Sequence, residues 1–120
     1  MKLTVHIVED DEANRSSLRD LLKIYGYSVA VYATGEEFLA RASVNSDSCV
    51  ILDVNLPGVS GLEILKHLRT RAVPIAAVIV SGRAGTDMRA QADRLGALAF
   101  FEKPIDIDRL VATIESVDRS

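Results

Sequence analysis

The chain has 120 residues, which fits one domain, and 48% of them are hydrophobic, enough for a complete core. The formal net charge of −3 argues against a DNA-binding role for this domain alone, because a protein that holds DNA needs a basic face. The single cysteine, Cys49, cannot form an internal disulfide and fits a reducing compartment. With no signal-peptide pattern and no apolar run of about 18 residues, the sequence predicts a soluble cytoplasmic protein with no membrane partner.

In the first third of the chain, short apolar runs alternate with helical patterns. Residues 3–8 and 29–32 are predicted to be strands, and the helix between them is predicted to end at Gly26. The apolar residues of this helix have i, i+3, i+4, i+7 spacing and are Leu18, Leu21, Leu22 and Tyr25. Thr34 and Glu37 have the spacing of a capping box, which predicts the start of a second helix.

The centre of the chain contains an apolar run that leads into an acid. Residues 49–52 predict a buried strand, and Asp53 follows directly. Residues 57–58 are Pro-Gly and suit a type II turn, and Ser60 with Glu63 predicts the cap of a third helix. An acid at the exit of a buried strand lies at the carboxyl edge of a sheet, where open α/β sheets bind ligands.

The last third repeats the alternation. Residues 75–80 and 97–101 are predicted strands, residues 86–95 a weakly amphipathic helix, and Asp106 the cap of a final helix. The apolar face of the final helix is Ile107, Leu110, Val111, Ile114 and Val117. Strands therefore alternate with helices five times. Continuous apolar strands are typical of a parallel sheet with helices on both faces, so the sequence predicts an α/β fold.

Chemically useful side chains follow four of the five predicted strands. They are Glu9 and Asp10 after the first strand, Asp53 after the third, Ser81 after the fourth and Lys103 after the fifth. Because the carboxyl ends of parallel strands meet at one edge, we expect these side chains to lie together.

Three carboxylates at close quarters would repel one another, and Mg²⁺, which takes oxygen ligands, would relieve the repulsion. Asp53 could act as a nucleophile toward phosphorus, with positive charge from Lys103 and a hydroxyl donor from Ser81. Taken singly, each residue also has an ordinary explanation. Asp53 fits a turn or a helix cap, and residues 9–12, all acidic, fit an exposed helix N-terminus. Ser81 fits a loop hydroxyl and Lys103 a surface lysine.

Four motifs, in order and spanning nearly the whole chain, resemble those of receiver domains of two-component response regulators. They are residues 7–11 (IVEDD), residues 52–61 (LDVNLPGVSG), Ser81, and residues 100–104 (FFEKP). The resemblance implies a flavodoxin-like, doubly wound, five-stranded parallel sheet in the order 2-1-3-4-5 with five helices. It also implies one receiver domain over residues 1–120, and a possible output domain beyond Ser120.

The resemblance assigns roles around Mg²⁺ by position. Asp53 is similar to the phosphoacceptor, Asp10 to the direct Mg²⁺ ligand, and Glu9 to the acid that holds a water on the metal. The backbone carbonyl of Asn55 would be a further ligand. Asp11 leaves the acid register open between Glu9-Asp10 and Asp10-Asp11, and we favour the first because the strand ends at residue 8.

The remaining roles concern the phosphoryl group and the switch. Ser81 resembles the hydroxyl that turns toward the phosphoryl group, and Phe100 lies where the family has a switching aromatic, although Phe100 alone fits a core residue. Lys103 resembles the lysine that contacts the phosphate, and the bond from Lys103 to Pro104 resembles the family's cis peptide bond.

The implied partners are a histidine kinase as donor and a second copy of the chain after phosphorylation, with nucleic acid bound only through an output domain. The family is a phosphoacceptor switch and not an enzyme in the usual sense. Two alternatives remain. A phosphatase of the haloacid-dehalogenase type also forms an aspartyl-phosphate, but it usually has a second Asp where this chain has Asn55. A receiver-like fold could also serve for binding alone.

Overall fold

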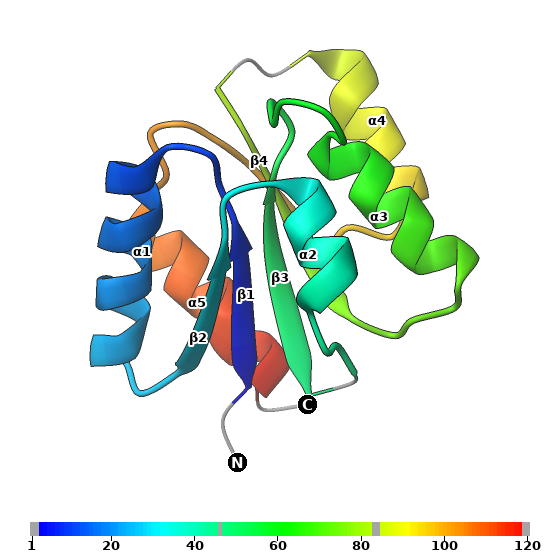
Figure 1. Cartoon of the computed structure of the whole chain (residues 1–120). Coiled ribbons are helices and arrows are strands. Elements are labelled where there is room, and N and C mark those ends of the chain that lie inside the picture. Colours follow the sequence, from blue (N-terminus) through cyan, green and yellow to red (C-terminus); the bar gives the residue numbers. More distant parts are fainter. Residues whose placement is uncertain (1–2, 46, 83–84, 119–120) are drawn as a thin grey trace.

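The computed structural model describes residues 3–45, 47–82 and 85–118, which form one five-stranded sheet with a helix after each strand (Figure 1). The strands are β1 (Thr4–Val8), β2 (Ser28–Tyr32), β3 (Ser48–Asp53), β4 (Ala76–Ser81) and β5 (Ala99–Glu102). The helices are α1 (Glu12–Ile24), α2 (Gly35–Arg41), α3 (Gly61–Thr70), α4 (Thr86–Arg94) and α5 (Ile107–Asp118). All neighbouring strands are parallel, in the order β2-β1-β3-β4-β5. The predicted flavodoxin-like, doubly wound fold is confirmed.

Two hydrophobic cores hold helices on opposite faces of the sheet. On one face lie α1 and α5, which contribute Leu22, Leu110 and Ile114 to the core (Figure 1). On the other face lie α2, α3 and α4, with Phe38 and Leu65 among the buried residues. Since β3 lies in the middle of the sheet and is buried along its whole length, its last residue is held firmly at the edge.

The strand register aligns the carboxyl ends of the strands. Val8 pairs with Leu52, so Glu9 and Asp53, the next residues after this pair, lie side by side at the ends of β1 and β3. Asp53 pairs with Val80, one residue before the end of β4. Ser81 then pairs with Glu102, which is followed directly by Lys103. Parallel pairing thus brings residues from four distant parts of the sequence to one edge.

Side-chain caps begin the helices largely as predicted. The Ser60 hydroxyl accepts from the N–H of Glu63 at 3.2 Å, and the Glu63 carboxylate accepts from the N–H of Ser60 at 3.3 Å, which completes the capping box. Asp106 accepts from the N–H of Arg109 at 3.3 Å. At Thr34 the hydroxyl accepts from the N–H of residue 37 at 3.0 Å.

The capping box predicted at Thr34 is wrong in one half. Among the contacts of the described residues, the Glu37 carboxylate does not return a bond to the backbone of Thr34. It lies 3.7 Å from Arg41, one turn further along α2. An exposed i, i+4 ion pair of this kind competes with the cap for the same carboxylate.

Some element boundaries differ from the prediction. Residue 97 was predicted to begin the last strand, but its N–H bonds to the carbonyl of Ala92 at 2.9 Å and closes the end of α4. Gly96 has φ of +74°, the left-handed conformation that commonly ends helices, so β5 begins only at Ala99. Ser81 belongs to β4 and does not follow it. In the part of the chain that is described, no helix has both the length and the apolar character needed to cross a membrane.

Candidate functional site at the carboxyl edge of the sheet

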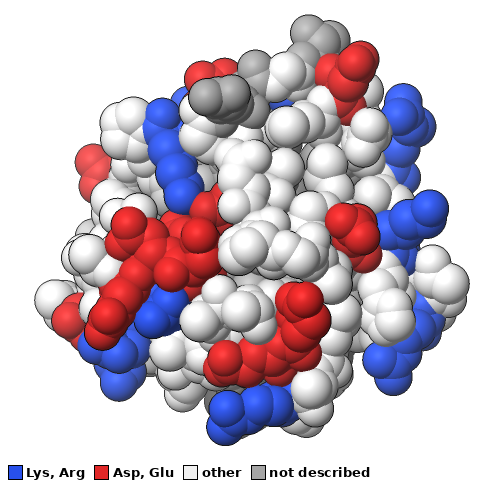
Figure 2. All heavy atoms as spheres, turned by 45° about the horizontal axis from the view of Figure 1, so that its top comes forward, with Lys and Arg blue, Asp and Glu red and all other residues white. Residues whose placement is uncertain are grey.

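Three carboxylates meet at the carboxyl edge of the sheet. Glu9 follows β1 directly, Asp10 is the next residue, and Asp53 ends β3. One oxygen from each carboxylate lies within 4.8 Å of the others. Asp53 and Glu9 are buried whereas Asp10 is exposed, so the cluster opens to solvent on the Asp10 side. Figure 2 views the molecule from this edge and shows acidic side chains gathered there.

Lys103 is the cation of the cluster. Its Nζ lies 2.6 Å from Oδ2 of Asp53 and 2.9 Å from Oε1 of Glu9. Burial by itself would lower the pKa of Lys103, but the hydrogen bonds to Asp53 and Glu9 and the negative charges of these two acids together outweigh burial and raise this pKa. Burial raises the pKa of Glu9, and the hydrogen bond from Lys103 offsets only part of that rise. Lys103 is therefore held charged beside the two buried acids.

The backbone places Lys103 and Asp53 where they meet. The N–H of Lys103 donates to the carbonyl of Ser81 at 2.8 Å, which extends the pairing of β4 and β5 by one residue. The Lys103–Pro104 peptide bond is cis. Oδ1 of Asp53 accepts from the N–H of Asn55 at 2.8 Å, which leaves Oδ2 for Lys103. Both residues are thus oriented by neighbouring backbone groups as well as by each other.

Gly61, the first residue of α3, lets that helix approach the acceptor strand. A Cβ added at Gly61 would lie 2.5 Å from the carbonyl oxygen of Asp53, closer than real Cβ contacts allow. A glycine is therefore required for α3 to begin against the end of β3.

Asp11 caps α1. Its Oδ1 accepts from the N–H of Asn14 at 3.0 Å, and its own N–H donates to Oε2 of Glu9 at 3.2 Å. The group of carboxylates at the edge contains Glu9 and Asp10 together with Asp53. Helix capping thus occupies the side chain of Asp11, which agrees with the Glu9-Asp10 register that we favoured from the sequence.

Ser81 and Phe100 connect this edge to α4. The buried Ser81 hydroxyl lies 3.9 Å from the sulfur of Met88 on α4. Phe100 is half-buried on β5, and the guanidinium carbon of Arg89 lies 4.6 Å from the centre of its ring. Arg89 also lies 3.2 Å from the carboxylate of Glu102. The contact of Arg89 with Phe100 was not predicted, because nothing in the spacing of an exposed arginine points to a ring on a later strand.

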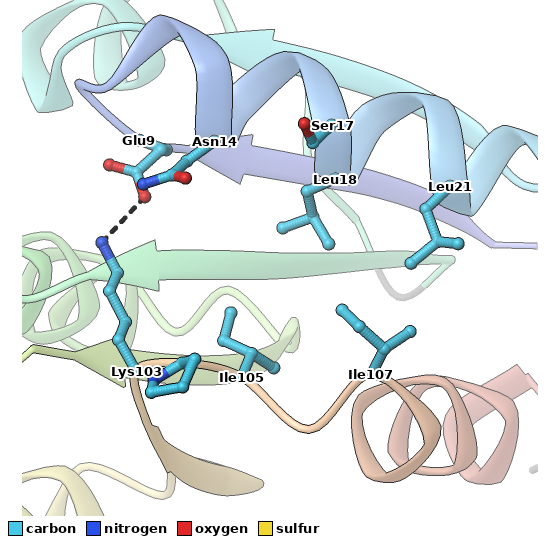
Figure 3. A pocket seen from close by; sticks show the side chains of 9 residues that line it. Glu9, Asn14, Ser17, Leu18, Leu21, Lys103, Ile105 and Ile107 are labelled. Atoms are coloured by element: carbon cyan, nitrogen blue, oxygen red, sulfur yellow. Dashed lines mark hydrogen bonds and ion pairs between the residues drawn. The ribbon is translucent and has the colours of Figure 1, made fainter.

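A groove of about 640 Å³ adjoins the cluster (Figure 3). Glu9 and Lys103 lie at one end of it, and apolar side chains of α1 face those of the segment that leads into α5. Its lining residues are Glu9, Asn14, Ser17, Leu18, Leu21, Lys103, Pro104, Ile105 and Ile107. Leu18 and Leu21, two of the periodic apolar residues of the predicted helix, are only half-buried, and both line this groove.

Cys49 takes no part in the cluster. The cysteine is free and buried in β3, and burial raises the pKa of its thiol to about 12. A thiol that stays protonated is a poor nucleophile and a poor metal ligand. The sequence interpretation of Cys49 as a small buried residue agrees with these observations.

The edge thus combines three acids, a lysine and a hydroxyl on a doubly wound parallel sheet. This combination defines the class of α/β proteins that carry a reactive carboxylate beside a cation site at the carboxyl edge of the sheet.

Comparison with known proteins gives the family. The family profile of the response regulator receiver domain matches residues 5–115. The transcriptional regulatory protein FixJ of Bradyrhizobium diazoefficiens is 36% identical over 115 residues, which cover 96% of this chain and 56% of that protein. The polar-differentiation response regulator DivK of Brucella suis is 35% identical over 120 residues, which cover 97% of this chain and 96% of that protein. The chain belongs to the response regulator receiver domain family.

Solved structures agree with this assignment. The crystal structure of FixJ-N superposes with a TM-score of 0.85 at 30% identity and covers 99% of this chain and 95% of that chain. A CheY-like receiver domain from Methanospirillum hungatei gives 0.86 at 29% identity and covers 99% and 96%. As a receiver domain, the chain is a phosphoacceptor switch and not a classical enzyme. The chain spans about half the length of the FixJ relatives that it matches.

Proposed function

We propose that the chain accepts a phosphoryl group from a histidine kinase onto Asp53 in a Mg²⁺-dependent reaction, and that this changes a surface that binds a partner or a second copy. The observation that carries the proposal is the contact of 2.6 Å between Lys103 and Asp53, inside a group of acids whose oxygens lie within 4.8 Å of one another. Lys103 is a cation beside the buried Asp53 carboxylate, in a cluster that opens to solvent on the Asp10 side.

The donor set fits Mg²⁺. Two buried carboxylates and one exposed carboxylate supply only oxygen ligands, and Lys103 compensates just one of the three negative charges. Asp10, Asp53 and the backbone carbonyl of Asn55 would hold the ion directly, and Glu9 through an intervening water. When bound, Mg²⁺ would neutralise negative charge on the oxygens of the phosphoryl group.

The residues of the chain would divide the transfer step among them. A carboxylate oxygen of Asp53 forms a bond to the phosphorus of phosphohistidine, and the phosphorus–nitrogen bond of the donor breaks. The electron pair of that bond stays on the imidazole of the donor, whose other ring nitrogen already carries a proton, so that the ring leaves as neutral imidazole. Before the transfer, the ammonium group of Lys103 contacts Oδ2 of Asp53. After it, this group would pair with a phosphoryl oxygen.

The added charge would then act on the switch residues. The Ser81 hydroxyl turns toward the new phosphoryl group and gives up its contact with Met88. Space near Phe100 changes, and with it the face made by α4, β5 and α5. A local change in charge thereby biases a two-state surface. That face would bind a second copy of the chain or an output partner.

The output itself has two precedents among the relatives. FixJ is named a transcriptional regulatory protein and is almost twice as long as the matched segment, whereas DivK is a response regulator of about the length of this chain. We propose control of transcription if an output domain follows Ser120, and a single-domain regulator if none does.

A labelling experiment tests the proposal. Acetyl phosphate with Mg²⁺ should add one phosphoryl group to the wild-type chain, measured by intact mass, and none to Asp53→Asn. The matched control is Asp108→Asn, which removes an exposed aspartate on α5 far along the chain and should label like wild type. Full labelling of the Asp53 variant would show that another residue is the acceptor, and an unlabelled wild-type chain would favour the alternative of a binding-only fold.

A further inference from the structure

Arg69 joins the C-terminal end of α4 to α3 and to the start of β4. Its Nε donates to the carbonyl of Leu95 at 2.8 Å and its Nη2 to the carbonyl of Gly96 at 3.2 Å. Its Nη1 donates to the carbonyls of Val73 at 3.2 Å and Ile75 at 2.9 Å. One side chain on α3 thus binds four backbone carbonyls from two other segments of the fold.

The chemistry of this contact suits a fixed joint. A guanidinium is planar and rigid, with five N–H donors, so it can hold several carbonyls in one geometry. The last carbonyls of a helix lack partners within the helix and carry the negative end of its dipole. Arg69 is half-buried, and among the ion pairs of the described residues none involves it. Its charge is therefore directed at the end of α4 and the turn beside it.

Among the described residues, the N-terminal end of α4 has weaker contacts. Its N-cap is Gly85, which has no side chain to cap the helix, and a Cβ there would have no described atom within 4 Å. Near this end the helix contacts the site through Met88, whose sulfur lies 3.9 Å from the Ser81 hydroxyl. The ion pair of Arg89 with Glu102 is exposed, and exposed pairs hold a helix only weakly. In the contacts that the described residues make, the two ends of α4 therefore differ in how they are attached.

We propose that Arg69 is a positioning residue that makes the C-terminal end of α4 the fixed end of this helix, so that phosphorylation of Asp53 displaces the end next to Ser81 and leaves the Arg69 end in place. The inference rests on the proposed function, since the phosphoryl group supplies the displacement. When Ser81 turns toward that group, Met88 loses its neighbour, and α4 pivots about the joint with α3. Figure 1 shows α4 lying beside α3 along this side of the sheet.

The pivot directs the motion to one part of the surface. Arg89 belongs to the N-terminal half of α4, so its contacts with Phe100 and Glu102 change when that half moves. Leu95 and Gly96 are held at the joint and keep their hydrogen bonds to Arg69. Without Arg69 the whole helix would shift, and the change would no longer be confined to the face shared with β5.

Amide hydrogen exchange of the full chain tests this, with and without Mg²⁺ and beryllofluoride, a mimic of the phosphoryl group. In the wild-type chain, activation should change exchange about tenfold at the N–H of Arg89, which bonds to Gly85 at 3.2 Å, and less than about twofold at the N–H groups of Leu95 and Gly96. In Arg69→Met, exchange at Leu95 and Gly96 should rise about tenfold before activation, because two hydrogen bonds to a charged group are lost. In this variant, exchange at Leu95 and Gly96 should also change when the chain is activated.

Two further variants complete the test. Arg69→Lys keeps the positive charge but not the forked arrangement of N–H donors. Its exchange at Leu95 and Gly96 should fall between that of wild type and that of Arg69→Met. If Arg69→Met does not fold, Arg69→Lys is the deciding variant. Arg71→Met removes a neighbouring exposed arginine at the C-cap of α3 and should match wild type.

The outcomes separate the two proposals. Binding of beryllofluoride is followed independently by fluorine NMR. A chain that binds none of it refutes the proposed function and this inference with it. A wild-type chain that binds it and changes equally at both ends of α4 refutes the inference alone. The inference alone is also refuted if Arg69→Lys and a folded Arg69→Met both keep the wild-type exchange pattern in full. If Arg69→Met does not fold, a full wild-type pattern in Arg69→Lys refutes it.

Discussion

Replacing Lys103 by methionine removes, in the described part of the chain, the one cation within hydrogen-bond distance of the carboxylates of Asp53 and Glu9. Coulomb's law with an effective dielectric constant of about 20 gives a repulsion of roughly 3.5 kcal/mol between two unit charges 4.8 Å apart, the spacing that bounds the oxygens of the acidic cluster. Removing one partner of a fully buried ion pair costs about 3–5 kcal/mol. Lys103 is 29% exposed, so solvent screens part of this, and we expect the free energy of unfolding to fall by about 2 kcal/mol.

The assay is urea denaturation at neutral pH, with and without Mg²⁺. Because Mg²⁺ would no longer compete with an ammonium group for the carboxylates, it should stabilise Lys103→Met by about 1 kcal/mol more than it stabilises wild type. Lys66→Met, which removes an exposed lysine on α3, is the control and should change neither quantity. If Lys103→Met were as stable as wild type, or if Mg²⁺ stabilised both equally, the charge balance described for the cluster would be refuted.

Three further predictions follow from packing and burial. Burial lowers the pKa of His6 from its usual 6.5, so below pH 6.5 the unfolded chain takes up a proton on His6 that the folded chain does not. The free energy of unfolding, measured with urea at several pH values, should therefore fall as the pH drops below 6.5. The fall should be smaller in His6→Gln. Gly61→Ala should cost about 1–3 kcal/mol and slow labelling by acetyl phosphate, because its Cβ would meet the carbonyl of Asp53; normal labelling would contradict the close approach. Ser60→Ala should cost about 1 kcal/mol in thermal unfolding while leaving labelling intact.

Features that depend on neighbouring residues were predictable from the sequence. The caps at Ser60 and Asp106 were found because a cap is a contact over three residues. The convergence of the acids with Lys103 was predictable for another reason: in a parallel sheet all strands end at the same edge, so the order of strands and side chains was sufficient.

Features that depend on contacts distant in sequence were not predictable. Arg69 bonds to Leu95 and Gly96, which lie 26 and 27 positions further along the chain. The sequence near Arg69 looks like an ordinary basic helix end. The start of the last strand was predicted too early because Ala97 is apolar, yet its N–H is already used to close α4. In both cases a backbone group had a tertiary or turn partner that residue types alone do not reveal.

We propose that strands β1, β3, β4 and β5 gather their side chains around an acceptor carboxylate that works with Mg²⁺. The most direct test is phosphoryl incorporation from acetyl phosphate measured against Mg²⁺ concentration, in wild type and in Asp10→Asn. We predict no incorporation without Mg²⁺, saturation at one phosphoryl group on Asp53, and a midpoint for Asp10→Asn shifted about tenfold or more to higher Mg²⁺. Incorporation that is independent of Mg²⁺, or an unchanged midpoint in Asp10→Asn, would show that Asp53 does not work with an ion held by Asp10.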